Sequence, residues 1–160
     1  IDSDGVLPAK DAFAESGTWE NRMNEVTLNG SCLCGAIRYE VVGDPQRFYH
    51  CHCLRCRKSS GTGHATNLML TNAKLVFSHG EALLKRYKVP DAERFTRQFC
   101  SECGSSVARV VPEIGAVIVP AGSLDCATPL QPQARIFWDS RAEWSCGDQE
   151  LPRFTEYPPA

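Results

Sequence analysis

Cysteines are the residues of this sequence whose type and spacing are best suited to chemistry. The chain has nine cysteines among 160 residues, and two of them, Cys126 and Cys146, stand alone and receive no role. The other seven form three short groups: Cys32-Leu33-Cys34, Cys51-His52-Cys53-Leu54-Arg55-Cys56 and Cys100-Ser101-Glu102-Cys103. Thiolates at such spacings can converge on a tetrahedral Zn²⁺ with Zn–S distances of about 2.3 Å. The cysteines therefore predict metal binding.

Seven sulfurs divide naturally into a set of four and a set of three. Four cysteines close a structural zinc site, whereas three protein ligands leave one coordination position for water or substrate. Two alternatives stay open. Both zincs could be structural, with His50 or His52 completing the second site, or the cysteines could form redox or disulfide pairs. If Cys51 and Cys53 share one face of a strand, the two histidines point to the other face.

The overall composition is that of a soluble globular protein. Hydrophobic residues make up 42% of the chain, charged residues 22%, and the net charge is −2. This balance argues against a nucleic-acid-binding surface, and no apolar run has the length of a membrane span. Residues 1–21 contain no basic segment followed by an apolar one, so we expect no secretory signal there and a cytoplasmic location.

Short segments of alternating polarity predict a mainly β fold. Ile37, Tyr39 and Val41 alternate with charged residues over 36–42, and we expect that strand to end at Gly43-Asp44-Pro45. Further strands are predicted at 47–53, 65–70, 74–77, 83–89, 94–99, 106–111, 116–119 and 134–138.

Turn residues organise these strands. Segments 90–93 and 112–115 would each close a hairpin, and 56–63 is expected to be a turn. Little helix is expected, and the architecture would be an antiparallel open sandwich or barrel whose loops zinc holds in place. We expect residues 1–22 to be a polar N-terminal extension and 23–160 to be a single zinc-binding β domain.

Longer motifs surround the cysteine groups. They are Gly30-Ser31-Cys32-Leu33-Cys34-Gly35, Cys51-His52-Cys53-Leu54-Arg55-Cys56-Arg57-Lys58, Phe99-Cys100-Ser101-Glu102-Cys103-Gly104 and Ala121-Gly122-Ser123-Leu124-Asp125. Over residues 28–155 this series resembles the glutathione-dependent formaldehyde-activating enzymes, whose relatives include centromere protein V. The resemblance implies a zinc-containing β-tent of mostly antiparallel sheet. It also implies a structural zinc and a catalytic zinc, the first bound by Cys32, Cys34, Cys100 and Cys103 and the second by Cys51, Cys53 and Cys56.

The implied activity is condensation of glutathione with formaldehyde to S-hydroxymethylglutathione, a carbon–sulfur lyase reaction in reverse. Zinc held by three thiolates has a formal charge of −1, so it is a weak Lewis acid toward water and hydrolysis is not expected. It can still take a thiol as its fourth ligand and release the thiol proton. His50 and His52 are candidates for a general acid or base toward the aldehyde oxygen, with a packing role as the alternative.

Three basic residues lie in sequence beside the three-cysteine group. Arg55, Arg57 and Lys58 could bind a glutathione carboxylate through charge-assisted hydrogen bonds. The alternative is that they are ordinary solvated surface charges.

Three functions fit the sequence. The chain could be the zinc enzyme just described, acting on a small thiol and a small aldehyde. It could instead be a glutathione or thiol carrier without catalysis, or a zinc-stabilised binding module, because a fold does not determine a function. The sequence carries no signal for the oligomeric state.

Overall fold

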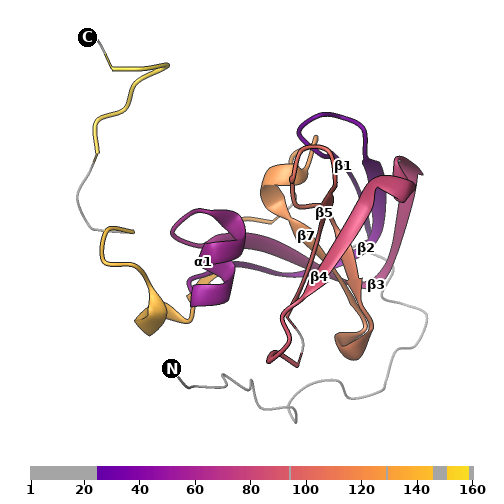
Figure 1. Ribbon diagram of the computed structural model, residues 1–160, viewed down its shortest axis with the longest axis horizontal. Coiled ribbons are helices and arrows are strands. Elements are labelled where there is room, and N and C mark those ends of the chain that lie inside the picture. The colour runs from indigo at the N-terminus through magenta and orange to yellow at the C-terminus, as the bar shows by residue number, and fades with distance from the viewer. Residues whose placement is uncertain (1–24, 94, 129, 146–150, 159–160) are drawn as a thin grey trace.

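The computed structural model describes residues 25–93, 95–128, 130–145 and 151–158, and strands dominate it (Figure 1). The extension predicted at 1–22 lies outside the described residues. The strands and helix run in the order β1 (Val26–Ser31), β2 (Arg38–Cys51), α1 (Leu54–Ser60), β3 (Ala65–His79), β4 (Leu84–Lys88), β5 (Thr96–Cys100), β6 (Arg109–Val111), β7 (Ala116–Pro120) and β8 (Ala134–Ile136). Short 3₁₀ turns η2 to η5 cover Glu81–Leu83, Pro112–Ile114, Ala121–Ser123 and Trp138–Ser140. The prediction of a mainly β fold with little helix is confirmed.

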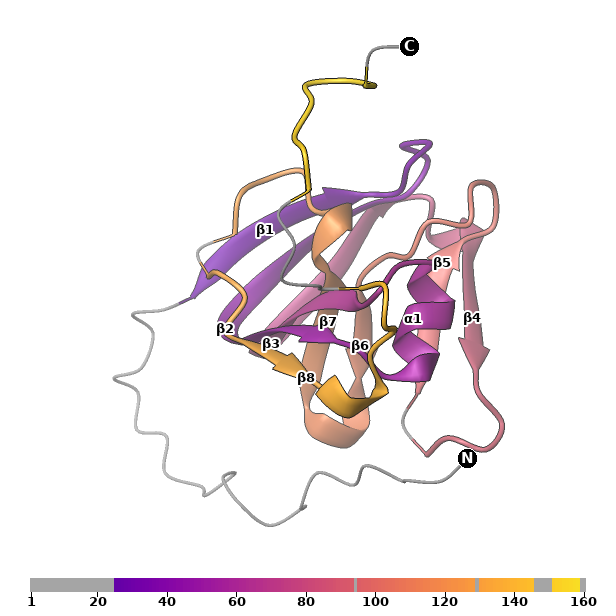
Figure 2. The same cartoon turned by 90° about the vertical axis from the view of Figure 1, so that its left-hand side faces the viewer.

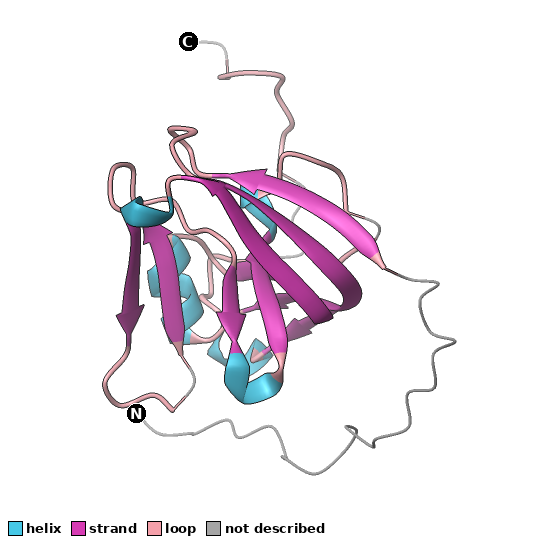
Figure 3. Ribbon diagram, turned by 90° about the vertical axis from the view of Figure 1, so that its right-hand side faces the viewer, coloured by secondary structure: helices cyan, strands magenta, loops and turns pink. Residues whose placement is uncertain are grey.

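The strands form two sheets. The larger sheet has the order β1-β2-β3-β7-β6, with β8 pairing to β2 in parallel and all other pairs antiparallel. Strands β4 and β5 form a separate antiparallel hairpin. Figures 2 and 3 show this hairpin as a second wall facing the large sheet, which gives the molecule the form of a tent.

The two longest strands each unite segments that the sequence predicted separately. Strand β2 joins most of 36–42 and 47–53, and β3 joins 65–70 and 74–77. Both predicted hairpins are confirmed as β4–β5 and β6–β7. The last predicted strand is shorter than expected, because β8 ends at Ile136 and a 3₁₀ turn follows.

A β-bulge explains why β2 does not end at Gly43. The register between β2 and β3 shifts between Val42 and Asp44, and the turn-type residues are absorbed there without breaking the strand. On β3, Asn72 has a positive φ of 47°, and its side-chain amide donates to the Asp44 carboxylate at 2.8 Å. A Cβ added at Gly43 would lie 2.6 Å from the Cβ of Ala73, so the close approach of the strands requires glycine.

Helix α1 lies where the sequence predicted a turn at 56–63, so that prediction was wrong. Cys53 is the N-cap, and its sulfur accepts a hydrogen bond from the amide of Cys56. Gly61 ends the helix in the left-handed conformation, with φ of 72°. Cysteine is an unusual cap, and seven residues are too few for an amphipathic pattern, so no clear signal for this helix is present in the sequence.

The hydrophobic core combines aliphatic side chains with cysteines of the first predicted site. The large buried residues are Leu28, Ile37, Tyr39, Val41, Phe48, Leu68, Leu70, Val107, Val117 and Val119. Cys32 and Cys100 belong to the same cluster, with exposed fractions of 3% and 0%. A metal bound by these cysteines would therefore be part of the core.

Candidate metal sites and the adjoining cavity

Two tight turns bring Cys32, Cys34, Cys100 and Cys103 together. The amide of Gly35 donates to the Cys32 carbonyl and that of Gly104 to the Cys100 carbonyl, each at 2.9 Å, and both glycines have positive φ. All four sulfurs lie within 4.8 Å of one another. The Sγ of Cys34 is 3.4 Å from that of Cys32 and 4.0 Å from that of Cys100. A tetrahedron with Zn–S distances of about 2.3 Å has edges of about 3.8 Å, so this donor set fits zinc.

Backbone amides support negative charge at this first cluster. The amide of Ile37 donates to the Cys32 sulfur at 3.2 Å. The amide of Ser105, followed by that of Cys34, lowers the pKa of Cys103 to about 6. Amides directed at sulfur stabilise thiolates, which are the form that binds metal.

The end of β2 and the start of α1 bring Cys51, Cys53 and Cys56 together. Cys51 is the last residue of β2, Cys53 caps the helix and Cys56 lies in its first turn. Their sulfurs lie within 4.8 Å of one another, and within the described part of the chain no histidine or carboxylate belongs to this group. The cluster thus offers three ligands from one short segment.

The three sulfurs of the second cluster strongly influence one another's ionisation. The Cys51 and Cys56 thiols lower the pKa of Cys53 to about 2. In turn, the sulfurs of Cys51 and Cys53 raise the pKa of Cys56 far above its ordinary value. Ionisation of the first thiol is favoured, and ionisation of the next is opposed by repulsion between the two thiolates. A divalent cation would remove this repulsion. Sulfur donors in this arrangement suit a soft or borderline cation such as zinc.

The histidines near the second cluster pack against one another. The ring of His64 lies 4.2 Å from that of His50 and 5.2 Å from that of His52, between centroids. The hydroxyl of Thr66 is 2.9 Å from Nδ1 of His50 and 3.1 Å from Nδ1 of His64. Burial lowers the pKa of all three histidines, so each is neutral at pH 7. His52 is fully buried and packs edge-on against Trp138, so its packing role is well supported.

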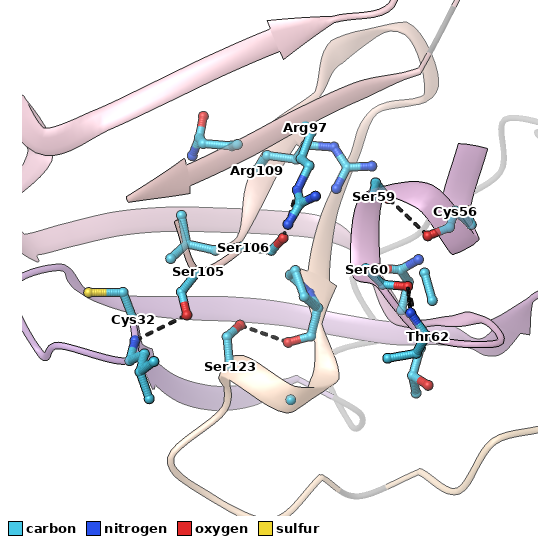
Figure 4. Close-up of a pocket in the computed structure, with 18 of the residues that line it drawn as sticks. Cys32, Cys56, Ser59, Ser60, Thr62, Arg97, Ser105, Ser106, Arg109 and Ser123 are labelled. Atoms are coloured by element: carbon cyan, nitrogen blue, oxygen red, sulfur yellow. Dashed lines mark hydrogen bonds between the residues drawn. The ribbon is translucent and has the colours of Figure 1, made fainter. Parts of the chain in front are cut away.

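A cavity of about 730 Å³ adjoins both cysteine clusters (Figure 4). Cys32 of the first cluster and Cys56 of the second are among its lining residues. Much of the remaining wall is polar, with hydroxyls from Ser31, Ser59, Ser60, Thr62, Thr66, Ser105, Ser106 and Ser123. His64 also lines the cavity. The cavity can therefore bring a polar ligand close to the three-cysteine group.

The charged side chains in the cavity wall are Arg97, Arg109 and Asp125. The Nε of Arg97 donates to Ser106 Oγ at 3.0 Å. Burial is the main cause that lowers the pKa of Arg109. The Asp125 carboxylate accepts a hydrogen bond from Ser31 at 2.9 Å.

The basic residues singled out from the sequence lie on helix α1. Arg55 and Lys58 are exposed and Arg57 is half-buried, and none of the three is among the residues that line the cavity. His64 follows the second cluster closely, but no partner for it was visible in the sequence. Sequence reasoning missed Arg97 and Arg109, because they come from segments far from the cysteines of the second cluster. No local pattern marks them, since only the tertiary fold brings their strands to one cavity.

The segment Ala121–Ser123 fixes one side of the cavity. The hydroxyl of Tyr39 is 2.6 Å from Ser123 Oγ, and burial raises the pKa of Tyr39 to about 12, so it stays protonated. The amide of Asp125 donates to the carbonyl of Asn29 on β1 at 2.9 Å. The Gly-Ser-Leu-Asp motif is thus held against β1, beside the first cysteine cluster.

A β-tent with seven cysteines gathered into a four-sulfur and a three-sulfur group defines a class of protein with two clusters that could each hold a metal ion. The family model for the glutathione-dependent formaldehyde-activating enzymes matches residues 27–140. The chain belongs to this family.

A curated relative agrees with this assignment, and a solved structure shares the fold. The relative, from Halomonas elongata, is named "Putative glutathione-dependent formaldehyde-activating enzyme". It is 32% identical over 125 residues, which cover 73% of this chain and 78% of the relative. A crystal structure of a Rhodobacter sphaeroides protein shares the fold with a TM-score of 0.51 at 20% identity, covering 68% of this chain and 99% of that one. In the described part of the chain, no helix has the length and apolar character to cross a membrane.

Proposed function

We propose that this protein joins glutathione and formaldehyde to form S-hydroxymethylglutathione, as a zinc-dependent carbon–sulfur lyase working in the synthetic direction. The observation that carries the proposal is the position of Cys56, which belongs to the three-sulfur group and also lines the cavity. A small molecule in the cavity can thus approach a candidate metal site to which the described residues contribute three ligands. Membership of the family supports the choice of these two substrates.

In this proposal the two metal sites have different tasks. Zinc at Cys32, Cys34, Cys100 and Cys103 is structural, and zinc at Cys51, Cys53 and Cys56 is catalytic. When bound by three thiolates, zinc supplies a fourth position at which a thiol loses its proton. The chain contributes rigidity, because the end of β2 and the first turn of α1 fix the three sulfurs before any ligand arrives.

The reaction needs a group that can hold a proton. The thiol sulfur bonds to the carbonyl carbon, the C=O double bond becomes a single bond, and the thiol proton ends on that oxygen. His64 lines the cavity as a neutral imidazole, hydrogen-bonded to Thr66, so it can accept the proton and return it to oxygen. His52 remains a candidate identified from the sequence, and its ring packs against His64.

The test is the rate at which glutathione and formaldehyde exchange with their adduct, measured by NMR magnetisation transfer. The adduct forms without a catalyst, so the uncatalysed rate is the baseline. The zinc-loaded protein is expected to raise the rate, Cys53→Ser to abolish the increase, and Cys126→Ser to retain it. Cys126 is an exposed cysteine outside both clusters, which makes it a matched control. Glutathione binding with no increase in rate would instead identify a thiol carrier, and no binding would favour the binding module.

A further inference from the structure

Two arginines reach the cavity from neighbouring segments on one side. Arg97 lies in β5, and Arg109 begins β6. The chain before β6 is held along β5 by a bridge between Phe99 and Ser106 and by a hydrogen bond from the Gln98 side chain to the Ala108 carbonyl. Figure 4 shows the side chains of Arg97 and Arg109 close together in the cavity wall, with Arg97 hydrogen-bonded to Ser106. Their positions are therefore set by backbone pairing.

Within the described ranges, no carboxylate neutralises either guanidinium. Among the described residues, no acidic side chain forms an ion pair with Arg97 or Arg109. The Nε of Arg109 is buried and has no hydrogen-bond partner there. Arg86 adds a further positive charge close enough to lower the pKa of Arg109, after the larger effect of burial. Arg109 is half-buried and its buried Nε is an unsatisfied donor, so this arrangement favours binding of an anion.

The two arginines line the cavity next to the proposed catalytic site, so an anion that they bind could be part of the substrate. Cys56 of the three-sulfur cluster lines the same cavity as Arg97 and Arg109. An anionic group bound to the arginines would therefore share that cavity with the three-sulfur cluster. The cavity of about 730 Å³ is far larger than formaldehyde requires, and it falls in the range of sites for peptide-sized or drug-sized ligands.

We propose that Arg97 and Arg109 bind a carboxylate of the thiol substrate, so that the cavity selects thiols that carry a carboxylate. This inference rests on the proposed function, which places the substrate's thiol group at the three-sulfur site. It adds the residues that would bind the substrate's carboxylate. Two guanidinium groups present planar sets of N–H donors that match a carboxylate. The basic residues of helix α1 that the sequence suggested would then have no part in binding.

The experiment is calorimetric titration of the zinc-loaded protein with three probes. Glutathione has both the thiol and the carboxylates, S-methylglutathione lacks the free thiol, and glutathione diethyl ester lacks free carboxylates. The variants are Arg109→Gln, Arg97→Gln and Arg55→Gln, with Arg47→Gln as the control because Arg47 is exposed and outside the cavity wall. Melting temperatures verify folding, and Arg97→Gln provides the test if Arg109→Gln does not fold.

The expected result is loss of affinity for both free-acid probes in the cavity variants. Arg97→Gln and Arg109→Gln are each expected to weaken the binding of S-methylglutathione about 10- to 100-fold. Arg47→Gln and Arg55→Gln should leave this affinity unchanged. The diethyl ester should bind weakly to wild type and show no further loss in the cavity variants. Unchanged affinity in folded Arg97→Gln and Arg109→Gln would overturn the proposal and leave the proposed function intact. S-methylglutathione binding that depends on the arginines, without any adduct catalysis, would uphold this site and refute the enzyme.

Discussion

Replacement of Cys100 by serine should unfold the protein, whereas replacement of Cys53 should not. Cys100 has no exposed surface and packs in the hydrophobic core. Its amide donates to the Ser105 carbonyl at 3.0 Å, and its carbonyl accepts from the amide of Gly104 at 2.9 Å. The residue thus connects the four-sulfur cluster, the turn that carries Cys103 and the core. Cys53 lies outside the core cluster and caps a helix of seven residues.

Typical free energies of zinc binding and of folding predict different stabilities for the two variants. A structural zinc site contributes on the order of 10 kcal/mol to folding, and a domain is stable by about 5–15 kcal/mol. Loss of the first zinc would therefore remove most or all of the free energy of unfolding. Serine is itself a favoured N-cap, so Cys53→Ser keeps the cap of α1 and loses only the metal at a site on the margin of the fold. Cys53→Ser should remain folded with a lowered melting temperature.

Thermal melting followed by circular dichroism, together with zinc content by mass spectrometry, measures this difference. Wild type is expected to hold two zincs per chain and Cys53→Ser one, while Cys100→Ser should show no cooperative transition. Cys34→Ser is a second test of the first site, because Cys34 is exposed and its replacement leaves the core packing in place. Cys126→Ser is the control and should melt like wild type. Equal losses of melting temperature for Cys53→Ser and Cys100→Ser would refute the division into a structural and a catalytic site.

Three smaller perturbations test other parts of the structure. Gly30→Ala should lower the free energy of unfolding by about 1–3 kcal/mol, measured in urea, because the added Cβ would lie 2.4 Å from the Tyr39 ring. Gly122→Ala is the control and should leave stability unchanged, because a Cβ at Gly122 would meet open space. Tyr39→Phe loses a hydroxyl hydrogen bond and should cost about 1 kcal/mol, against no change for Tyr87→Phe at an exposed position. Burial lowers the pKa of His52, so the unfolded chain binds more protons just below pH 6.5 and wild-type stability falls as the pH drops through that window. His52→Phe should lose less stability than wild type over the same pH range. An identical pH dependence in the two proteins would contradict the attribution of this effect to His52.

Metal binding and the three-ligand group at 51–56 could be predicted from the sequence because cysteine spacing directly limits ligand geometry. The pairing of Cys32 and Cys34 with Cys100 and Cys103 was implied only by the resemblance to the family. The strands with clear alternation, such as the one containing Tyr39 and Val41, were also predictable. The continuity of β2 and β3 was not, because glycine, proline and asparagine usually end strands and here form a bulge. Whether such residues turn the chain or bend a strand is decided by the neighbouring strand, which a local pattern does not contain.

The cavity wall was the least predictable part of the site. Basic residues adjacent in sequence to a metal motif are natural candidates for substrate binding, and Arg55 and Lys58 were chosen for that reason. The helix turns both toward solvent. Arg97 and Arg109 reach the cavity because β5 pairs with the chain just before β6, a contact between segments that each look like ordinary strands.

The central claim is that a substrate thiol loses its proton at the Cys51, Cys53 and Cys56 site. Calorimetric titration of the zinc-loaded protein with glutathione, in two buffers of different ionisation enthalpy, measures that proton directly. Glutathione binding should release protons to the buffer, and no release is expected with S-methylglutathione or in the folded Cys53→Ser variant. Glutathione binding with the same heat in both buffers would contradict it.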